Sequence, residues 1–204
     1  SCAVFDAGGG LVANGPHIPV HLGAMSESVR AVLVAYPRPE PGDAYLTNDP
    51  SGGGSHLPDL TVVSPVFDDA GSLRFFVASR GHHADVGGTT PGSMPADSRT
   101  LDEEGVLFEA TRVVRGGRFA REEVVAHLEG APFPARRVPE NLADLEAQLA
   151  ANRRGAALLS ALSEEEGGPR VTAYMAHVQA HAAAAVRRTL DRLAPGVHRF
   201  EDAM

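Results

Sequence analysis

Two short clusters of histidine and aspartate flank a predicted β-hairpin, and they constrain the fold of this chain more than any other feature. An apolar run at 60–67, a turn at 68–72 and a second apolar run at 73–79 have the composition of two strands joined by a tight connection. A hairpin returns the chain to the point where it started, so it brings the clusters at its two ends together. The members of the clusters are His56 and Asp59 on one side, and His82, His83 and Asp85 on the other.

Imidazoles and carboxylates gathered at one end of a hairpin form a site for a divalent metal ion that can activate water. Adjacent side chains of a strand point to opposite faces, so His82 and His83 are not expected to bind the same ion. The predicted ligands are therefore His56, Asp59 and His82. His83 or Asp85 would then orient a ligand, or face the substrate as an acid or base. The alternative is that several of these groups only hydrogen-bond loop backbones and hold the turns in shape.

The residues before the first cluster have weaker signals. The glycines at 52–54 lack the spacing and the lysine of a phosphate-binding loop, and they are expected instead to let the backbone turn tightly so that His56 enters the site. Asp49 is a candidate catalytic residue, although it could simply shape a turn. His17 and His21 flank a proline loop, and either could point into the site, although a loop histidine is more often a surface or packing group.

Composition excludes several classes of protein. The chain has 204 residues, of which 43% are hydrophobic, enough for one ordinary domain or two small ones. The net charge of -8 disfavours nucleic acid or an anionic membrane as a partner, since both require basic patches. No apolar run approaches the ~20 residues needed to span a bilayer. The single cysteine, Cys2, permits no internal disulfide and fits a cytoplasmic compartment.

Periodicity predicts an α+β fold, with a β-rich metal-site region at 1–115 and a helical region at 116–204. Expected strands lie at 1–6, 11–13, 44–47, 60–67, 73–79 and 106–114. Expected helices lie at 25–36, 121–128, 139–162 and 171–193. His177 and His181 share one face of the last helix, but without a third ligand nearby they are not expected to bind a metal. Asn152 lies on the apolar face of the longest helix and is expected to serve in packing.

Several strings of this sequence resemble the hydantoinase B/oxoprolinase family, and they keep their order across nearly the whole chain. The strings are Phe5-Asp6-x-x-Gly9, Pro16-His17-Ile18-Pro19-Val20-His21-Leu22-Gly23, Asn48-Asp49-Pro50, Gly54-Ser55-His56-Leu57-Pro58-Asp59, His82-His83-Ala84-Asp85-Val86-Gly87-Gly88, Pro91-Gly92-Ser93-Met94 and Glu104-Gly105. Members are much longer than 204 residues, so the resemblance implies part of one larger domain, truncated at both ends.

The resemblance also implies a function. Members work with an ATP-using partner of the hydantoinase A type, which phosphorylates a cyclic amide or ketone oxygen, and the B component then acts on the activated species. It implies a metal on His56, Asp59 and His82, with His83 a contender. Manganese is the first choice, and zinc, iron or cobalt are alternatives. ATP itself is not expected to bind, because the sequence has no nucleotide-binding fingerprint.

The predicted function is thus ATP-dependent hydrolysis of a cyclic amide at a divalent metal, with Asp49, His83 and Asp85 as candidate catalytic residues. Two alternatives stay open. The chain could belong to an acetone-carboxylase-type subunit, or it could be an inactive fragment that only binds the partner subunit.

Overall fold

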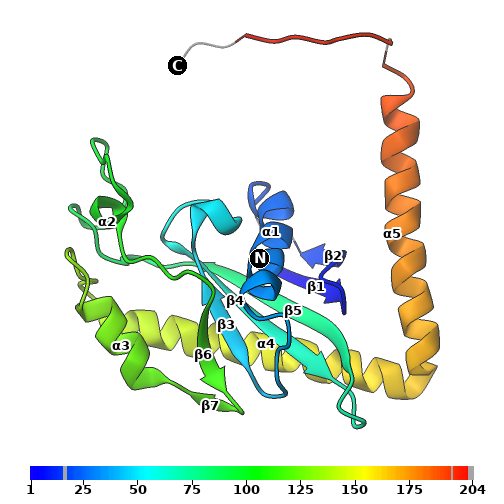
Figure 1. The fold of residues 1–204 in the computed structure, drawn as a ribbon, viewed down its shortest axis with the longest axis horizontal. Helices are drawn as coiled ribbons and strands as arrows, with labels where there is room; N and C mark the ends of the chain where they lie inside the picture. Colours follow the sequence, from blue (N-terminus) through cyan, green and yellow to red (C-terminus); the bar gives the residue numbers. More distant parts are fainter. Residues whose placement is uncertain (16–17, 194, 202–204) are drawn as a thin grey trace.

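The computed structural model describes residues 1–15, 18–193 and 195–201, and its centre is a seven-stranded antiparallel sheet with the order β2-β1-β5-β4-β3-β6-β7 (Figure 1). The strands are β1 (Cys2–Asp6), β2 (Leu11–Gly15), β3 (Ala44–Thr47), β4 (Asp59–Phe67), β5 (Leu73–His82), β6 (Thr111–Arg115) and β7 (Arg118–Phe119). The helical segments are α1 (His21–Ala35), the 3-10 turn η1 (Pro50–Gly52), α2 (Leu101–Glu104), α3 (Arg121–Glu129), α4 (Val138–Glu166) and α5 (Gly168–Leu190). His17, one of the two loop histidines considered above, lies outside the described residues.

The predicted hairpin is the long central pair of strands, β4 and β5. Asp59 pairs with His82 at its open end, and Phe67 pairs with Leu73 beside the turn. The side chain of Asp68 accepts hydrogen bonds from the backbone of Ala70 and Ser72, which stabilises that turn. Seven of the nine residues of β4 are buried, because helices cover both faces of the sheet there and an almost continuous apolar run is needed.

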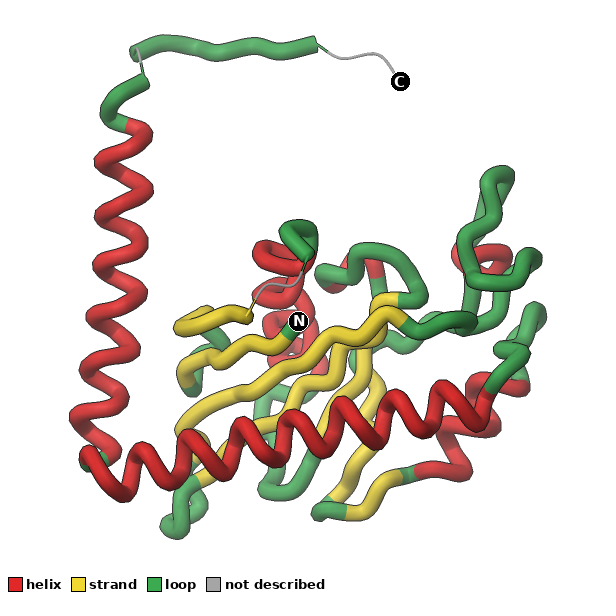
Figure 2. Tube along the Cα trace, turned by 180° about the vertical axis from the view of Figure 1, so that it is seen from behind, coloured by secondary structure: helices red, strands yellow, loops and turns green. Residues whose placement is uncertain are grey.

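The two faces of the sheet bury different sets of side chains against different helices. On one face α1 packs through Met25, Val29 and Val32. On the other face α4 runs across the central strands and packs through Leu142, Leu145 and Leu149 (Figure 2). Alternation along a strand decides which face a residue joins. Asp59 and His82 therefore lie on the α1 face, at the end of the sheet where α1 begins.

The α+β class is confirmed: the sheet occupies the N-terminal half and long helices follow it. The division into regions 1–115 and 116–204 stays a prediction, and the short strand β7 adds Arg118 and Phe119 to the edge of the sheet. The described chain contains no helix long and apolar enough to cross a membrane.

Several element boundaries differ from the prediction, among them the ends of β5 at His82 and of α4 at Glu166, and two differences have a clear physical reason. Helix α1 begins at His21, four residues before the expected start at Met25. Its first turn contains exposed residues such as Leu22, so the helical spacing of buried apolar residues is not visible there in the sequence. Strand β6 begins at Thr111 instead of residue 106. The backbone N–H of Phe108 donates to the side chain of Asn48 instead of to a strand, and Ala110 has a positive φ of 42°. A positive φ in a residue with a side chain interrupts an extended strand.

Helix α4 is joined to the sheet by buried amide side chains as well as by apolar contacts. Asn152 donates to the backbone oxygen of Val62 and to the hydroxyl of Ser64, which confirms its expected role in packing. Helix α5 turns away from the sheet after Gly167 and extends beyond it (Figures 1 and 2). A pocket of about 680 Å³ lies between β1, β2 and these two helices, and apolar side chains such as Val12 and Tyr174 line it.

Candidate metal centre

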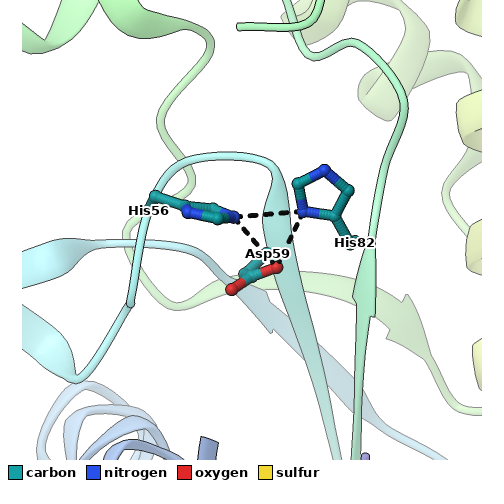
Figure 3. Close-up of side chains that lie close together, drawn as sticks. All are labelled: His56, Asp59 and His82. Carbon is teal, nitrogen blue, oxygen red and sulfur yellow. Dashed lines mark hydrogen bonds and ion pairs between the residues drawn. The ribbon is translucent and has the colours of Figure 1, made fainter. Parts of the chain in front are cut away.

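Three predicted ligands meet at the open end of the central hairpin (Figure 3). His56 Nε2 lies 3.2 Å from Asp59 Oδ1, and His82 Nδ1 lies 3.1 Å from the same oxygen. The two ring nitrogens are 3.1 Å apart. The Asp59 side chain is only 3% exposed, whereas those of His56 and His82 are 38% and 47% exposed. The cluster thus has a buried anion at its base and an open side toward solvent.

The geometry of these three atoms fits a shared cation. Ligands at about 2.1 Å from one ion, separated by angles of about 90–110°, lie roughly 3.0–3.4 Å from one another. The three observed separations fall in that range. The lone pair or N–H of each ring nitrogen lies in the ring plane and points in a single direction. Each nitrogen can therefore form a well-aligned hydrogen bond with only one of the two neighbouring ligand atoms. A cation at the centre would satisfy all three atoms at once. Two imidazoles and one carboxylate suit Mn, Zn, Fe or Co.

A second histidine contact holds the other oxygen of Asp59. His21 Nε2 lies 3.0 Å from Asp59 Oδ2, and both side chains are 3% exposed. His21 is the first residue of α1, so the start of that helix is joined to the start of β4. Its Nδ1 lies 2.9 Å from the hydroxyl of Ser1, the residue before β1.

Asp59 is therefore an anion despite its burial. Burial raises the pKa of a carboxyl, but the hydrogen bonds from His21 and His82 and the charge of His56 outweigh it, so the pKa of Asp59 lies below its ordinary value. An ionised carboxylate is the form that a metal ion requires.

The glycine-rich turn places His56, as expected. Gly53 has a positive φ of 87°, and a Cβ there would lie 2.6 Å from the backbone oxygen of Ala24. A Cβ on Gly54 would lie 2.4 Å from the backbone oxygen of Asn48. Only residues without a side chain allow the turn to pack this closely against α1 and against the segment that follows β3.

The buried side chain of Arg80 stabilises the glycine-rich turn through hydrogen bonds. The residue is 3% exposed, and it pairs with Thr61 across the hairpin, on the same face as Asp59. Its guanidinium donates to Thr61 Oγ1 at 2.7 Å, Ser55 Oγ at 2.9 Å, and Ser28 Oγ and the Gly53 oxygen at 2.8 Å each. One buried side chain thus connects the hairpin, α1 and the loop that carries His56.

His83 lies on the opposite face of the sheet from His82, as alternation predicts. The side chain is buried against α4, with Nε2 3.1 Å from Gln148 Oε1 and Nδ1 3.1 Å from Asn141 Nδ2. The amide nitrogen can only donate, so Nδ1 accepts and the ring is neutral. Burial lowers the pKa of His83, and the hydrogen bond to Gln148 only opposes this effect. These contacts join α4 to the strand end that presents His82.

Asp85 organises the long loop after the hairpin. Its carboxylate accepts hydrogen bonds from the backbone of Gly87 at 3.0 Å, Gly92 at 3.0 Å and Arg136 at 3.1 Å, and from the Arg136 side chain at 2.8 Å. Arg136 also donates to the backbone oxygens of Gly87 and Gly88. Burial raises the pKa of Asp85, but these hydrogen bonds more than offset it and leave the pKa below its usual value.

We expect the substitution Asp85→Asn to destabilise the protein by roughly 1.5–3 kcal/mol at neutral pH, because four donors lose a charged acceptor. The folded-state pKa is depressed, so the stabilisation is complete above the unfolded pKa of about 3.9 and is lost as the pH falls through the lower folded value. Thermal unfolding from pH 7 down to pH 2 should show the difference from wild type shrinking only at the acidic end. The exposed Asp69→Asn is the control, and a constant difference across the whole range would contradict the assignment.

Asp49 and Asn48 shape the segment before η1. Asp49 Oδ1 accepts a hydrogen bond from Ser51 N at 2.9 Å and caps η1. Asn48 is fully buried, and its amide donates to the backbone oxygens of Leu57 and Val106. No described contact joins Asp49, His83 or Asp85 directly to the three clustered ligand atoms, so their proton-transfer roles stay predictions.

Sequence reasoning missed Arg80, Asn141 and Gln148 as residues that support the site, and it left His21 undecided. Arg80 carries a signal in retrospect, since it lies two residues before His82, a spacing that puts both side chains on the same face of the strand. Asn141 and Gln148 lie seven residues apart on one helix, a spacing that returns to the same face after two turns.

Comparisons with known proteins agree with this description. A family model described as hydantoinase B/oxoprolinase matches residues 1–204. The protein 5-oxoprolinase 1 of Arabidopsis thaliana is 51% identical over 206 residues, which cover 95% of this chain and 16% of the plant protein. The caprolactamase subunit beta of Pseudomonas jessenii is 29% identical over 208 residues, covering 100% of this chain and 35% of that subunit.

Two solved structures share the fold. The crystal structure of the ATP-dependent caprolactamase from Pseudomonas jessenii superposes with a TM-score of 0.86 and 27% sequence identity, over 96% of this chain and 33% of that one. A nucleotide-free acetone carboxylase has a TM-score of 0.72 over 85% of this chain and 22% of its own, and at 21% identity this is a likeness of fold alone.

The architecture and the cluster define an α+β protein with two histidines and one carboxylate at the open end of a central hairpin. The chain belongs to the hydantoinase B/oxoprolinase family. It spans about 16% of the length of the 5-oxoprolinase it matches, so it corresponds to one part of such a protein.

Proposed function

We propose that this chain forms the metal-binding part of an ATP-dependent hydrolase of cyclic amides, of the hydantoinase or 5-oxoprolinase type. The observation that carries the proposal is the closed triangle of His56, Asp59 and His82, with separations of 3.1–3.2 Å around a buried carboxylate oxygen. Family membership and identity to a 5-oxoprolinase support the cyclic amide as the class of substrate.

The position of each of the three ligands indicates its role in the site. Asp59 supplies the negative charge from the base of the cluster, and the half-exposed rings of His56 and His82 form the rim that a substrate would reach. A divalent ion held there would act as a Lewis acid toward water or toward an oxygen of the substrate. Manganese is our first choice among the metals that this mixed ligand set suits.

Activation of the substrate belongs to a partner in this proposal. An amide carbon is a poor electrophile, and phosphorylation of the amide oxygen would provide a leaving group and a more reactive carbon. The sequence has no nucleotide-binding fingerprint, so we assign ATP to a hydantoinase A-type subunit or domain. The description of the similar caprolactamase as ATP-dependent, with a subunit beta, supports this division. A cytoplasmic location stays a prediction.

The residues around the cluster would keep it in place during the reaction. His83 joins α4 to the strand end beside His82, and Asp85 holds the loop that follows. We propose that both position the site, with Asp49 holding the turn before His56. A direct part of any of the three in proton transfer would require the substrate to approach them, and it stays a prediction.

The proposal is tested with the complete polypeptide that contains this chain, purified together with its ATP-using partner. Elemental analysis should find roughly one divalent ion per chain in the wild type and in His177→Ala, which removes an exposed histidine on α5. The substitution His56→Ala should lose the ion while the circular dichroism spectrum stays unchanged. Stoichiometric metal in His56→Ala would contradict the ligand assignment.

Activity assays on the same preparations distinguish the candidate reactions. ATP-dependent opening of the ring of 5-oxoproline to glutamate, or of hydantoin to its N-carbamoyl amino acid, supports the hydrolase. ATP-dependent carboxylation of acetone would establish the carboxylase instead. A metal-free protein that binds the partner but turns over none of these substrates would favour the alternative that the chain is an inactive segment that only binds the partner.

A further inference from the structure

The hydrogen bond between His21 and Asp59 is a feature that the proposed ligand set leaves unexplained. His21 Nε2 lies 3.0 Å from Asp59 Oδ2 inside the protein. An ionised carboxylate can only accept, so His21 Nε2 carries the proton and donates it. In a neutral imidazole the other nitrogen then accepts, and the Ser1 hydroxyl lies 2.9 Å from Nδ1, in position to donate to it. The Ser1 hydroxyl thereby favours the tautomer that Asp59 needs.

The two oxygens of Asp59 have different partners. Oδ1 is 3.2 Å from His56 and 3.1 Å from His82, within the cluster. Oδ2 is bound by His21, which is not among the three residues whose ligand atoms converge. Rotation of the carboxylate to present both oxygens to one ion would break a buried hydrogen bond to a charged group, at a cost of about 1.5–3 kcal/mol.

His21 is itself rigidly placed. It begins α1, and that helix is packed against the sheet through Met25 and Val29. The same helix contacts the loop that carries His56, because Ser28 Oγ donates to the Gly53 oxygen at 3.1 Å. One helix therefore holds both the orientation of Asp59 and the loop of His56.

We propose that His21 is a positioning residue that restricts Asp59 to a single metal-facing oxygen, and that it thereby selects the metal. This inference rests on the metal site proposed above. A one-oxygen carboxylate with two imidazoles suits Mn²⁺ or Zn²⁺, whereas Ca²⁺ prefers six to eight oxygen ligands and readily takes both oxygens of a carboxylate. His21 would therefore favour the first group of ions over calcium and leave further coordination positions open for water and substrate.

The test compares two substitutions in the complete polypeptide. His21→Met keeps a long side chain without an N–H donor, and His21→Gln keeps a donor near the position of Nε2. We expect His21→Met to weaken Mn²⁺ binding about 10–100-fold, the usual effect of losing a hydrogen bond to a ligand. It should also reduce the preference for Mn²⁺ over Ca²⁺. His21→Gln should stay close to wild type in both respects. Competition with a chelator measures the dissociation constants.

The outcomes separate this inference from the proposed function. A wild-type protein that binds no divalent ion would refute the metal site itself. If the wild type binds Mn²⁺ and folded His21→Met binds it equally well, the role of His21 is refuted while the site stands. Equal losses in His21→Met and His21→Gln would also overturn the role as donor. If His21→Met does not fold, the metal-loaded wild-type structure decides. One Asp59 oxygen on the ion supports the inference, and two oxygens or a His21 nitrogen on the ion overturn it.

Discussion

Asp59→Asn is expected to abolish stoichiometric metal binding and to lower ATP-dependent turnover about a thousandfold. The amide keeps the shape of the side chain but removes the only negative charge of the cluster, which lies buried between three imidazoles. Loss of a metal ion that stabilises the charge of a transition state removes several kcal/mol, and about 4 kcal/mol corresponds to three orders of magnitude in rate. Elemental analysis and turnover of 5-oxoproline with the partner present measure the two effects.

The matched control is Asp69→Asn, which removes an exposed carboxylate from the turn at the far end of the same hairpin. It should retain both the ion and the activity. Folding of Asp59→Asn is followed by circular dichroism, so that loss of metal can be told from loss of structure. A folded Asp59→Asn protein with full metal content and wild-type turnover would show that the cluster is not the reaction centre.

Arg80→Met is expected to have the second-largest effect, a destabilisation of about 3 kcal/mol together with weaker metal binding. The methionine fills the space but removes a charged donor from the oxygens of Gly53, Ser28 and Thr61, and the Gly53 oxygen keeps only the hydrogen bond from Ser28 Oγ. Each buried group left unsatisfied costs about 1–3 kcal/mol. His56 belongs to the same loop as Gly53, so a less rigid loop should also weaken metal binding at the site. Thermal unfolding and Mn²⁺ titration measure the two consequences.

Arg80→Lys tests whether the shape of the guanidinium matters as well as its charge. A lysine retains the cation but cannot reproduce a planar fork with four partners, so we expect it to recover only part of the stability. Arg30→Met is the control, because Arg30 is exposed and its contact with Glu27 lies on the surface. Surface ion pairs contribute about 0–1 kcal/mol. If Arg80→Met were no more harmful than Arg30→Met, the guanidinium would not support the loop.

Much of the site was predictable because the hairpin is local. Strands β4 and β5 are joined by a five-residue turn, and their apolar runs are continuous enough to identify from composition. Once the two strands pair, alternation determines that His82 and not His83 shares a face with Asp59. The role of the glycines before His56 was predictable for a similar reason, since consecutive glycines let the backbone turn tightly.

The supporting residues were not predictable in this way, because their partners lie far away in the sequence. Arg80 lies 52 residues from Ser28, and Gln148 lies 65 residues from His83. Nothing local distinguishes a buried arginine that serves four acceptors from one that would be exposed. His21 was hidden by its exposed neighbours, which obscure the true start of α1.

The amino-acid sequence by itself determined the fold class, the central hairpin and the convergence of His56, Asp59 and His82. These depend on periodicity and on short connections, where chain geometry leaves few alternatives. Only the tertiary structure decided which group faces each oxygen of Asp59, which helix contacts the loop of His56, and which side chains of α4 bind His83. Those contacts depend on how α1 and α4 dock on opposite faces of the sheet, and docking is a collective result of packing that no local pattern encodes.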